Sequence, residues 1–303
     1  MQQQFAHDAL DMVEYGDSRA VLVLADSEAG LGEGRRSAER AGFRISGAVP
    51  FADGIERLDR QAAVDAVWLG LEQDHGPALD RMLDRLYAEA HADRYGSVVS
   101  APPALIDIIA GRATHERMIH LCEANEAERI AAIRQATERA RLELHDVGAD
   151  GQGQLRQLSE EVGRIAHILA NLSESEARDR AAQGPDAEPI HAGEIRAAIR
   201  ARRLRDHFFN AEFFADPAWD MLLDLMAARL EQQRVAVSSL CIAAAVPPTT
   251  ALRWIKTLSD HGLLVRAADP QDGRRVYVGL SDPAAAAMEA YLKAARRISP
   301  LAL

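Results

Sequence analysis

The feature that most constrains the fold is a pair of short apolar segments joined by a charged tip near the C-terminal end of the 303-residue chain, in the stretch HGLLVRAADPQDGRRVYVGLS. Leu263 to Ala267 and Val276 to Leu280 have the composition of strands. Asp269 to Arg275 between them contains Pro270 and Gly273, which favour a tight turn. The sequence therefore predicts a hairpin with two adjacent arginines at its tip.

Two helices joined by a short break are predicted directly before this hairpin. The first, Val237 to Ala245, is short and rich in alanine, and the second runs from Thr249 to His261. Two consecutive prolines, Pro247 and Pro248, lie in the break. Such a pair of helices is typical of helix-turn-helix domains. An earlier helix begins at Asp216-Pro217, and its apolar face carries Trp219, Leu222, Leu223, Met226 and Leu230.

The second helix separates into a core face and an outward face. Ala251, Ile255 and Leu258 are expected in the core, and Trp254 is expected to pack rather than to stack on bases. A polar, basic helix start can enter the major groove of DNA, and an arginine at the hairpin tip can reach phosphates or the minor groove. The candidate DNA-contacting residues are therefore Thr249, Thr250, Arg253, Lys256, Arg274 and Arg275.

The order helix, turn, helix, Gly-Leu, strand, D-P-x-D-x-R, strand, L-S resembles the winged-helix domain of the MarR family of bacterial regulators, over Ile195 to Arg297. The resemblance implies a winged helix-turn-helix fold that binds double-stranded DNA. In that family one acid of the wing usually orients an arginine, which implies this role for Asp272 toward Arg274 or Arg275. The Pro247-Pro248 pair departs from the usual serine-rich turn and leaves the start of the recognition helix open.

The first hundred residues alternate between strand and helix signals. This regular order predicts a small doubly wound sheet of parallel strands. The expected strands are Ala20 to Leu24, Phe43 to Val49, Ala66 to Leu69 and Gly96 to Ser100, and the expected helices are Leu31 to Ala41, Asp53 to Arg60 and Ala78 to Ala90.

Three segments, VLVLADSEAG, DAVWLG and GSVVSAPP, resemble the first, third and fourth strands of response-regulator receiver domains. A working receiver needs two acids, a phosphoacceptor aspartate, a hydroxyl and a lysine. Here Asp26 matches one acid and Ser100 the hydroxyl, but Ala25 replaces the other acid and Gly70 the phosphoacceptor. No lysine occurs between residues 101 and 121. The resemblance therefore implies a pseudo-receiver that is not phosphorylated.

The segment after this domain has the pattern of a helical connector. Residues 124 to 147 read as a charged helix, and Ser173 to His191 read as a linker. Between them, apolar residues recur at spacings of 3, 4, 3, 4 and 3, which is the seam of a coiled coil. We favour pairing between two chains over packing within one, because the apolar stripe is narrow. The seam residues are Leu155, Leu158, Val162, Ile165, Leu169 and Leu172.

Charge is distributed unevenly along the chain. Ala192 to Leu303 carries 15 Lys/Arg against 12 Asp/Glu, whereas residues 1 to 191 carry 20 against 34. Such asymmetry favours nucleic-acid binding by one domain only. The net charge of −11 weakens non-specific DNA binding, so any DNA binding depends on local basic patches.

The residues give no support for catalysis, a metal site or membrane insertion. There is no Ser/His/Asp set, phosphate-binding glycine loop or Cys-x-x-Cys motif, and His115 and His120 are poorly spaced for one helix face. The start of the chain lacks a signal segment, and prolines interrupt the uncharged run from Val235 to Leu252. Cys122 and Cys241 are expected to be reduced, buried thiols. We expect a cytoplasmic protein that is not an enzyme and needs no cofactor.

The predicted architecture combines α/β and α+β domains. It comprises a receiver-like α/β domain at residues 1–121, a coiled-coil dimerisation region at 122–175, a linker at 176–191 and a winged helix-turn-helix domain at 192–303. The first hypothesis is a homodimeric, sequence-specific transcription regulator that binds two DNA half-sites. The alternative is a signalling adaptor in which the pseudo-receiver and the winged helix bind proteins rather than DNA.

Overall fold

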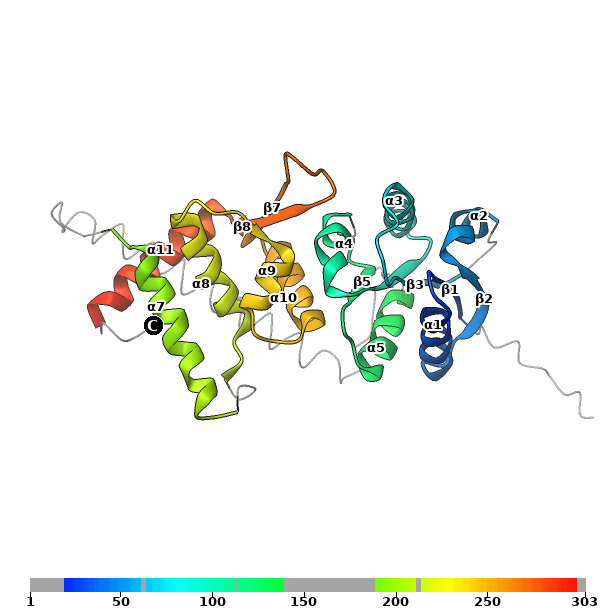
Figure 1. Ribbon diagram of the computed structural model, residues 1–303, viewed down its shortest axis with the longest axis horizontal. Helices are drawn as coiled ribbons and strands as arrows, with labels where there is room; N and C mark the ends of the chain where they lie inside the picture. The colour runs from blue at the N-terminus through cyan, green and yellow to red at the C-terminus, as the bar shows by residue number, and fades with distance from the viewer. Residues whose placement is uncertain (1–18, 61–63, 113, 139–188, 211–213, 299–303) are drawn as a thin grey trace, which may run out of the picture.

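The computed structural model describes residues 19–60, 64–112, 114–138, 189–210 and 214–298 (Figure 1). Residues 19–138 form one domain, here called the N-terminal domain, and residues 189–298 form a second, the C-terminal domain. All six predicted seam residues, from Leu155 to Leu172, and residues 176–188 of the predicted linker lie outside the described residues. The coiled coil therefore stays a prediction.

The N-terminal domain is built on a five-stranded parallel sheet with the strand order β2-β1-β3-β4-β5. The predicted parallel, doubly wound arrangement is thus present. β1 is buried along its whole length, as its uninterrupted apolar sequence predicts. The strands are β1 (Ala20–Ala25), β2 (Arg44–Pro50), β3 (Ala66–Gly70), β4 (Gly96–Ser100) and β5 (Met118–Leu121).

Helices cover both faces of this sheet. Val21 and Val23 of β1 pack toward α1 and α5, whereas Leu22 and Leu24 pack toward α2, α3 and α4, so the domain has three layers. The helices are α1 (Glu28–Arg40), α2 (Gly54–Asp59), α3 (Pro77–His91), α4 (Ile106–Arg112) and α5 (Glu126–Thr137), with short turns η1 (Phe51–Asp53) and η2 (Pro103–Leu105).

One glycine allows a large side chain into the sheet. The indole of Trp68 on β3 is fully buried beneath α1. A Cβ atom on Gly34 of α1 would lie 2.5 Å from Cδ1 of Trp68 and 2.7 Å from Cγ1 of Val23. The close approach of α1 to β3 therefore requires glycine at position 34.

The C-terminal domain combines helices with a small antiparallel sheet of strand order β6-β8-β7. The Asp216 side chain accepts a hydrogen bond from the backbone N–H of Trp219, and Pro217 begins α8, as predicted. The elements are α7 (Ala192–Leu204), η3 (Arg205–His207), α8 (Pro217–Leu230), β6 (Val235–Ala236), α9 (Val237–Ala243), α10 (Pro248–Asp260), β7 (Leu264–Ala268), β8 (Val276–Leu280) and α11 (Asp282–Ile298).

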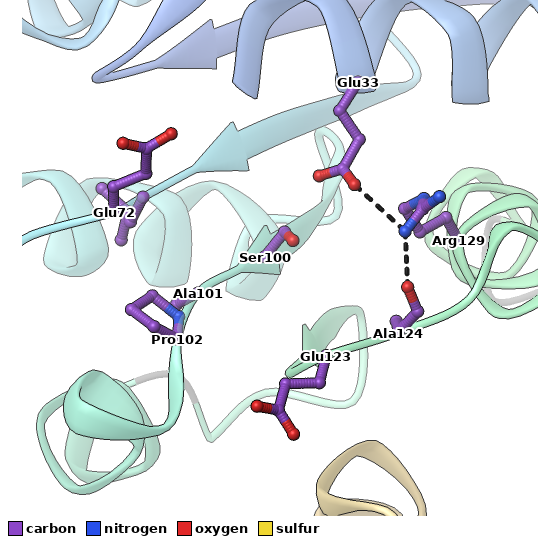
Figure 2. A pocket seen from close by; sticks show the side chains of 9 residues that line it. Glu33, Glu72, Ser100, Ala101, Pro102, Glu123, Ala124 and Arg129 are labelled. Atoms are coloured by element: carbon purple, nitrogen blue, oxygen red, sulfur yellow. Dashed lines mark hydrogen bonds and ion pairs between the residues drawn. The ribbon is translucent and has the colours of Figure 1, made fainter. Parts of the chain in front are cut away.

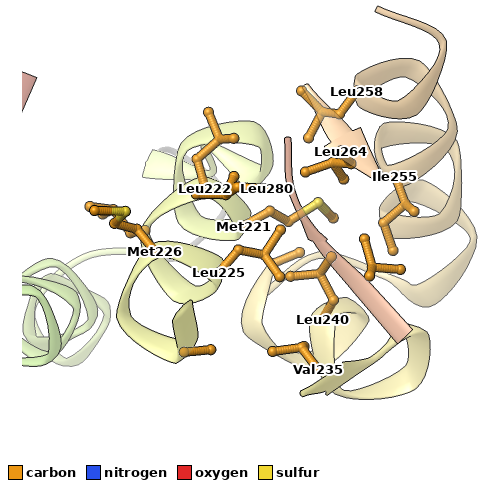
Figure 3. Packing of buried hydrophobic residues seen from close by; sticks show 14 of the residues in the cluster. Met221, Leu222, Leu225, Met226, Val235, Leu240, Ile255, Leu258, Leu264 and Leu280 are labelled. Carbon is orange, nitrogen blue, oxygen red and sulfur yellow. The ribbon is translucent and has the colours of Figure 1, made fainter. Parts of the chain in front are cut away.

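The apolar core of this domain lies between α8, α9, α10 and the sheet (Figure 3). Ala251, Ile255 and Leu258 of α10 are buried in it, as predicted. Leu230 is 40% exposed, so its predicted place on the apolar face of α8 is wrong. Trp254 packs against the core at its edge. The same cluster includes Ile106, Ala110 and Cys122 of the N-terminal domain, so the core continues across the junction between the domains.

Several elements differ from the sequence-based expectations. α4, β5, α7, β6 and α11 were not predicted. The helix predicted for residues 124–147 is seen from Glu126 to Thr137, and the described part of the domain ends at residue 138. Cys122 and Cys241 are free, buried thiols, as predicted. Among the described residues, no helix is both long and apolar enough to cross a membrane.

Candidate functional site

The carboxyl ends of the parallel strands bring together the positions predicted from receiver domains. Ala25 pairs with Gly70, and Gly70 pairs with Ser100 on the next strand. Ligands of open α/β sheets bind at this edge. Gly70 contributes no side chain there, so the three positions are adjacent but lack a carboxylate nucleophile.

Asp26 holds the loop that follows β3. Its carboxylate, with a side chain only 3% exposed, accepts hydrogen bonds from the backbone N–H groups of Glu72 at 2.9 Å and Gln73 at 3.1 Å, and its Oδ2 lies 3.0 Å from Nε2 of His75. The ring of His75 stacks on Phe51. Because these partners occupy the carboxylate, Asp26 fixes the loop rather than offering ligand oxygens to a cation.

A cavity of about 290 Å³ opens beside this edge (Figure 2). Ser100 lines it together with Glu33, Glu72, Glu123 and Arg129. Arg129 forms an ion pair with Glu33 at 3.0 Å, so its charge is already neutralised within the domain. The remaining carboxylates oppose the binding of a phosphoryl group. In the chain segments that the structure describes, no three His, Cys, Asp or Glu side chains gather into a metal-binding group.

The second candidate surface is formed by α10 and the β7–β8 hairpin, and is called the α10–hairpin surface below. Arg253 is exposed and Thr250 partly exposed on α10. Lys256 forms an ion pair with Asp260 at 3.0 Å, one turn further along the helix. At the hairpin tip, the side chain of Arg275 is 61% exposed.

Asp272 organises the tip of the hairpin. Its Oδ1 accepts a hydrogen bond from the backbone N–H of Arg274 at 3.1 Å, and its Oδ2 lies 3.4 Å from Nε of Arg275. The carboxylate thus contacts the side chain of Arg275 and only the backbone of Arg274. Tyr277 also supports the hairpin, since its hydroxyl donates a hydrogen bond to Asp269 at 3.0 Å.

Thr249 was expected to face outward as a DNA-contacting residue, and this expectation is wrong. It is only 4% exposed, at the first turn of α10. Its hydroxyl accepts a hydrogen bond from the backbone N–H of Cys122 at 2.9 Å and donates one to the carbonyl of Cys122 at 2.8 Å. The reason is tertiary, because the end of β5 packs against the start of α10.

Arg274 also contacts the N-terminal domain. Its two terminal nitrogens bond to both carboxylate oxygens of Asp74, at 2.7 and 2.8 Å, and its Nε donates to Asp80 at 2.9 Å. The hydrogen bond from Arg274 lowers the pKa of the Asp74 carboxyl below its usual 3.8, and the two carboxylates raise the pKa of the guanidinium.

Sequence reasoning missed the residues that join the domains. Asp74 lies in the loop between β3 and α3, and no pattern predicted its pairing with Arg274. Asp80, Asp107, Ser238 and Arg266 carried no motif. Their contacts join positions 131 to 200 residues apart, and no local pattern signals such pairs.

Neither a protein-family model nor a curated protein matches the chain. Solved structures that are similar to the chain include a probable transcriptional regulator from Pseudomonas aeruginosa. The identity is 32% over 28% of this chain and 61% of that one, and the TM-score is 0.23. A transcriptional regulator from Thermotoga maritima shows 21% identity over 33% and 63%, with a TM-score of 0.23.

A third solved structure is a signal receiver domain of an HD domain-containing protein from Pseudomonas fluorescens Pf-5, with 16% identity over 39% of this chain and 94% of that one at a TM-score of 0.30. The structural neighbours thus include transcriptional regulators and a signal receiver domain. The chain spans less than two thirds of the length of the two regulators.

Proposed function

We propose that the chain is a sequence-specific, DNA-binding transcription regulator whose C-terminal domain is a winged helix-turn-helix. The observation that carries the proposal is the α10–hairpin surface. α9, a turn and α10 are followed by a hairpin, with exposed Arg253 on the helix and exposed Arg275 at the tip. A helix that enters the major groove and a basic hairpin beside it supply base contacts and phosphate contacts respectively.

The two faces of α10 suit this use. Ala251, Ile255 and Leu258 anchor the helix in the core, while Arg253 projects away from it. Arginine reads guanine by two hydrogen bonds in the major groove. Arg275 lies at the end of a hairpin stiffened by Pro270, so it is suited to a phosphate rather than to a base.

The regulator is a cytoplasmic homodimer held by the predicted coiled coil, and its two winged helices bind the half-sites of a pseudo-palindrome. The N-terminal domain is a pseudo-receiver without enzymatic activity that acts independently of phosphorylation. The glycine at position 70 and the loop-holding bonds of Asp26 support this part of the proposal.

The test is selection from a randomised pool of DNA duplexes, followed by titration of the selected duplex. Arg253→Ala should weaken binding to the selected sequence by about 1–3 kcal/mol and relax discrimination at one position. Arg275→Ala should weaken binding to all sequences more evenly and reduce the salt dependence. Lys293→Ala, which removes one positive charge from α11, is the control and should change little, because α11 extends away from α10 and the hairpin (Figure 1).

The result that contradicts the proposal is an absence of salt-dependent binding to any duplex in the pool by every form of the protein tested. In that case the alternative, a signalling adaptor whose domains bind proteins, would replace it.

A further inference from the structure

The two domains meet along a junction that includes much of the α10–hairpin surface. In Figure 1, α9, α10 and the hairpin face α4 and the end of β5. Ile106 and Ala110 of α4, together with Cys122, belong to the buried apolar cluster of the C-terminal domain. The centre of the junction is therefore apolar, and separation of the domains would expose these side chains to water.

Asp107 of α4 caps the N-terminus of α9 in the other domain. The residue before α9 is Ala236, which has no side chain able to cap the helix. The Asp107 carboxylate instead accepts hydrogen bonds from the backbone N–H and the hydroxyl of Ser238, both at 2.8 Å. A carboxylate in the first turn of a helix satisfies donors that have no partner within the helix. The N-terminal domain thus provides a cap that α9 itself lacks.

The hairpin makes the most specific contact. Asp74 accepts hydrogen bonds from both terminal nitrogens of Arg274, and Asp80 accepts one from its Nε. This planar fork of donors matches a carboxylate and a phosphate equally well. The N–H groups that Arg274 would donate to a DNA phosphate are therefore already bonded to Asp74 and Asp80. Arg274 cannot bind the two carboxylates and a phosphate at the same time.

Close backbone approach reinforces the contact. Arg266 of β7 donates a hydrogen bond to the carbonyl of Ala110 at 2.6 Å. A Cβ atom on Gly111 would lie 3.0 Å from both the carbonyl oxygen of Arg274 and Cγ2 of Val276. The hairpin can lie this close to α4 because position 111 has no side chain.

From these contacts we infer that the N-terminal domain competes with DNA for the C-terminal domain: Asp74 and Asp80 hold Arg274, the backbone of Cys122 holds Thr249, and tight DNA binding requires this junction to open. The inference rests on the proposed function, because it assigns a regulation to the same surface. Arg253 and Arg275 stay exposed in the closed arrangement, so the closed protein retains weak, incomplete DNA contact.

Asp26 is the positioning residue of this contact. The loop whose backbone it holds at Glu72 and Gln73 is the loop that carries Asp74. The acid that matches the metal-binding position of receivers thereby sets the place of the carboxylate that pairs with Arg274.

The main experiment compares DNA affinity in two full-length double variants. Asp74→Asn/Asp80→Asn removes the charges that hold Arg274 and should tighten binding to a randomised duplex pool by about tenfold, since a hydrogen bond to a charged group contributes about one tenfold step or more. Glu56→Gln/Asp59→Asn is the control, because it removes the same charge on α2, away from the junction (Figure 1). The control should gain less than about twofold from reduced repulsion alone.

A second variant opens the junction without a change of charge. Gly111→Leu places a side chain where the hairpin approaches α4, while leucine favours the helix more than glycine does. The opening itself is read at Cys122, which is 2% exposed in the junction. Both Asp74→Asn/Asp80→Asn and Gly111→Leu should accelerate thiol labelling of Cys122, identified by peptide mass spectrometry, whereas the α2 control should not.

The possible failures are distinct. If the wild-type protein binds DNA but neither opened variant binds it more tightly, the inference is wrong and the proposed function stands. If no form of the protein binds DNA, opened variants included, the proposed function is wrong.

Discussion

The carboxyl edge of the five-stranded sheet and the α10–hairpin surface satisfy their polar groups in different ways. At the edge, Asp26 bonds to the loop after β3, and Arg129 pairs with Glu33 of the same domain. At the α10–hairpin surface, Thr249 and Arg274 bond to residues of the other domain, 127 to 200 positions away. Hydrogen bonds and ion pairs within one domain stabilise a fixed site. Contacts between two domains can be replaced by contacts with another partner.

This difference indicates which region can act as a switch. Breaking the hydrogen bonds of Asp26 would release the exposed backbone of Glu72 and Gln73 to water, without freeing a group that DNA could bind. Separation of the domains also costs apolar burial, but a DNA phosphate can replace Asp74 and Asp80 as the partner of Arg274. We therefore place regulation at the junction rather than at the edge.

The largest expected effect tests how rigid the N-terminal domain is. Gly34→Ala should lower its free energy of unfolding by about 3 kcal/mol, because the new methyl group would overlap the indole of Trp68 and must displace it. The measurement is chemical denaturation followed by tryptophan fluorescence. Gly32→Ala on the same helix is the control, since its methyl group would meet only the mobile end of Arg36 and should stabilise by about 0.5–1 kcal/mol. Equal effects of the two substitutions would show that α1 is loosely packed.

The fold was largely predictable because its local patterns agree with its tertiary structure. β1 and β3 are continuous apolar runs that end up buried on both faces. Asp216 and Pro217 are residues typical of a helix start, and α8 begins at them. α4 was missed because it is short and follows two prolines, and β6 was missed because a strand of two residues has no readable periodicity.

The candidate site was only partly predictable, for a physical reason. The side chains suited to DNA contact follow from helix periodicity and turn chemistry, and Arg253 is exposed as expected. Whether Thr249 and Arg274 are available depends on the docking of a second domain, which is decided by long-range shape and charge. Gly111 and Asp107 enable that docking, yet each is an ordinary helix residue when read in sequence alone.

A smaller effect concerns pH at the junction. The pKa of Asp74 is lowered by its bonds to Arg274, so this pair stabilises the closed protein above the usual carboxyl pKa of 3.8 and ceases to do so as pH falls through the lowered value. The difference in free energy of unfolding between the wild type and Asp74→Asn should therefore shrink as pH falls through this range. Denaturant unfolding at a series of pH values measures it.

The cause of this pH dependence can be isolated by removing the partner. In an Arg274→Gln background the hydrogen bonds from the guanidinium to Asp74 are lost, so substitution of Asp74 should change the pH dependence much less. A dependence that persists in that background would assign the lowered pKa to the backbone N–H of Gly76, which also donates to Asp74.

The smallest expected effect is the response of the carboxyl edge to phosphorylating reagents, for which we predict no change. Acetyl phosphate and beryllofluoride act on receivers through an aspartyl carboxylate beside bound Mg²⁺, and Gly70 supplies no carboxylate. Asp26 alone is a weak Mg²⁺ ligand, because that ion needs more than one anionic anchor and the oxygens of Asp26 already accept backbone hydrogen bonds. Intact mass after treatment, with DNA affinity measured in parallel, gives the result, and a receiver domain with its aspartate in place serves as positive control. An acid-labile adduct on Asp26, Asp65 or Asp74 that also shifted DNA affinity would refute the pseudo-receiver interpretation. Without such an adduct, the pseudo-receiver interpretation stands, and the loop that Asp26 holds remains the structural link between this edge and Arg274.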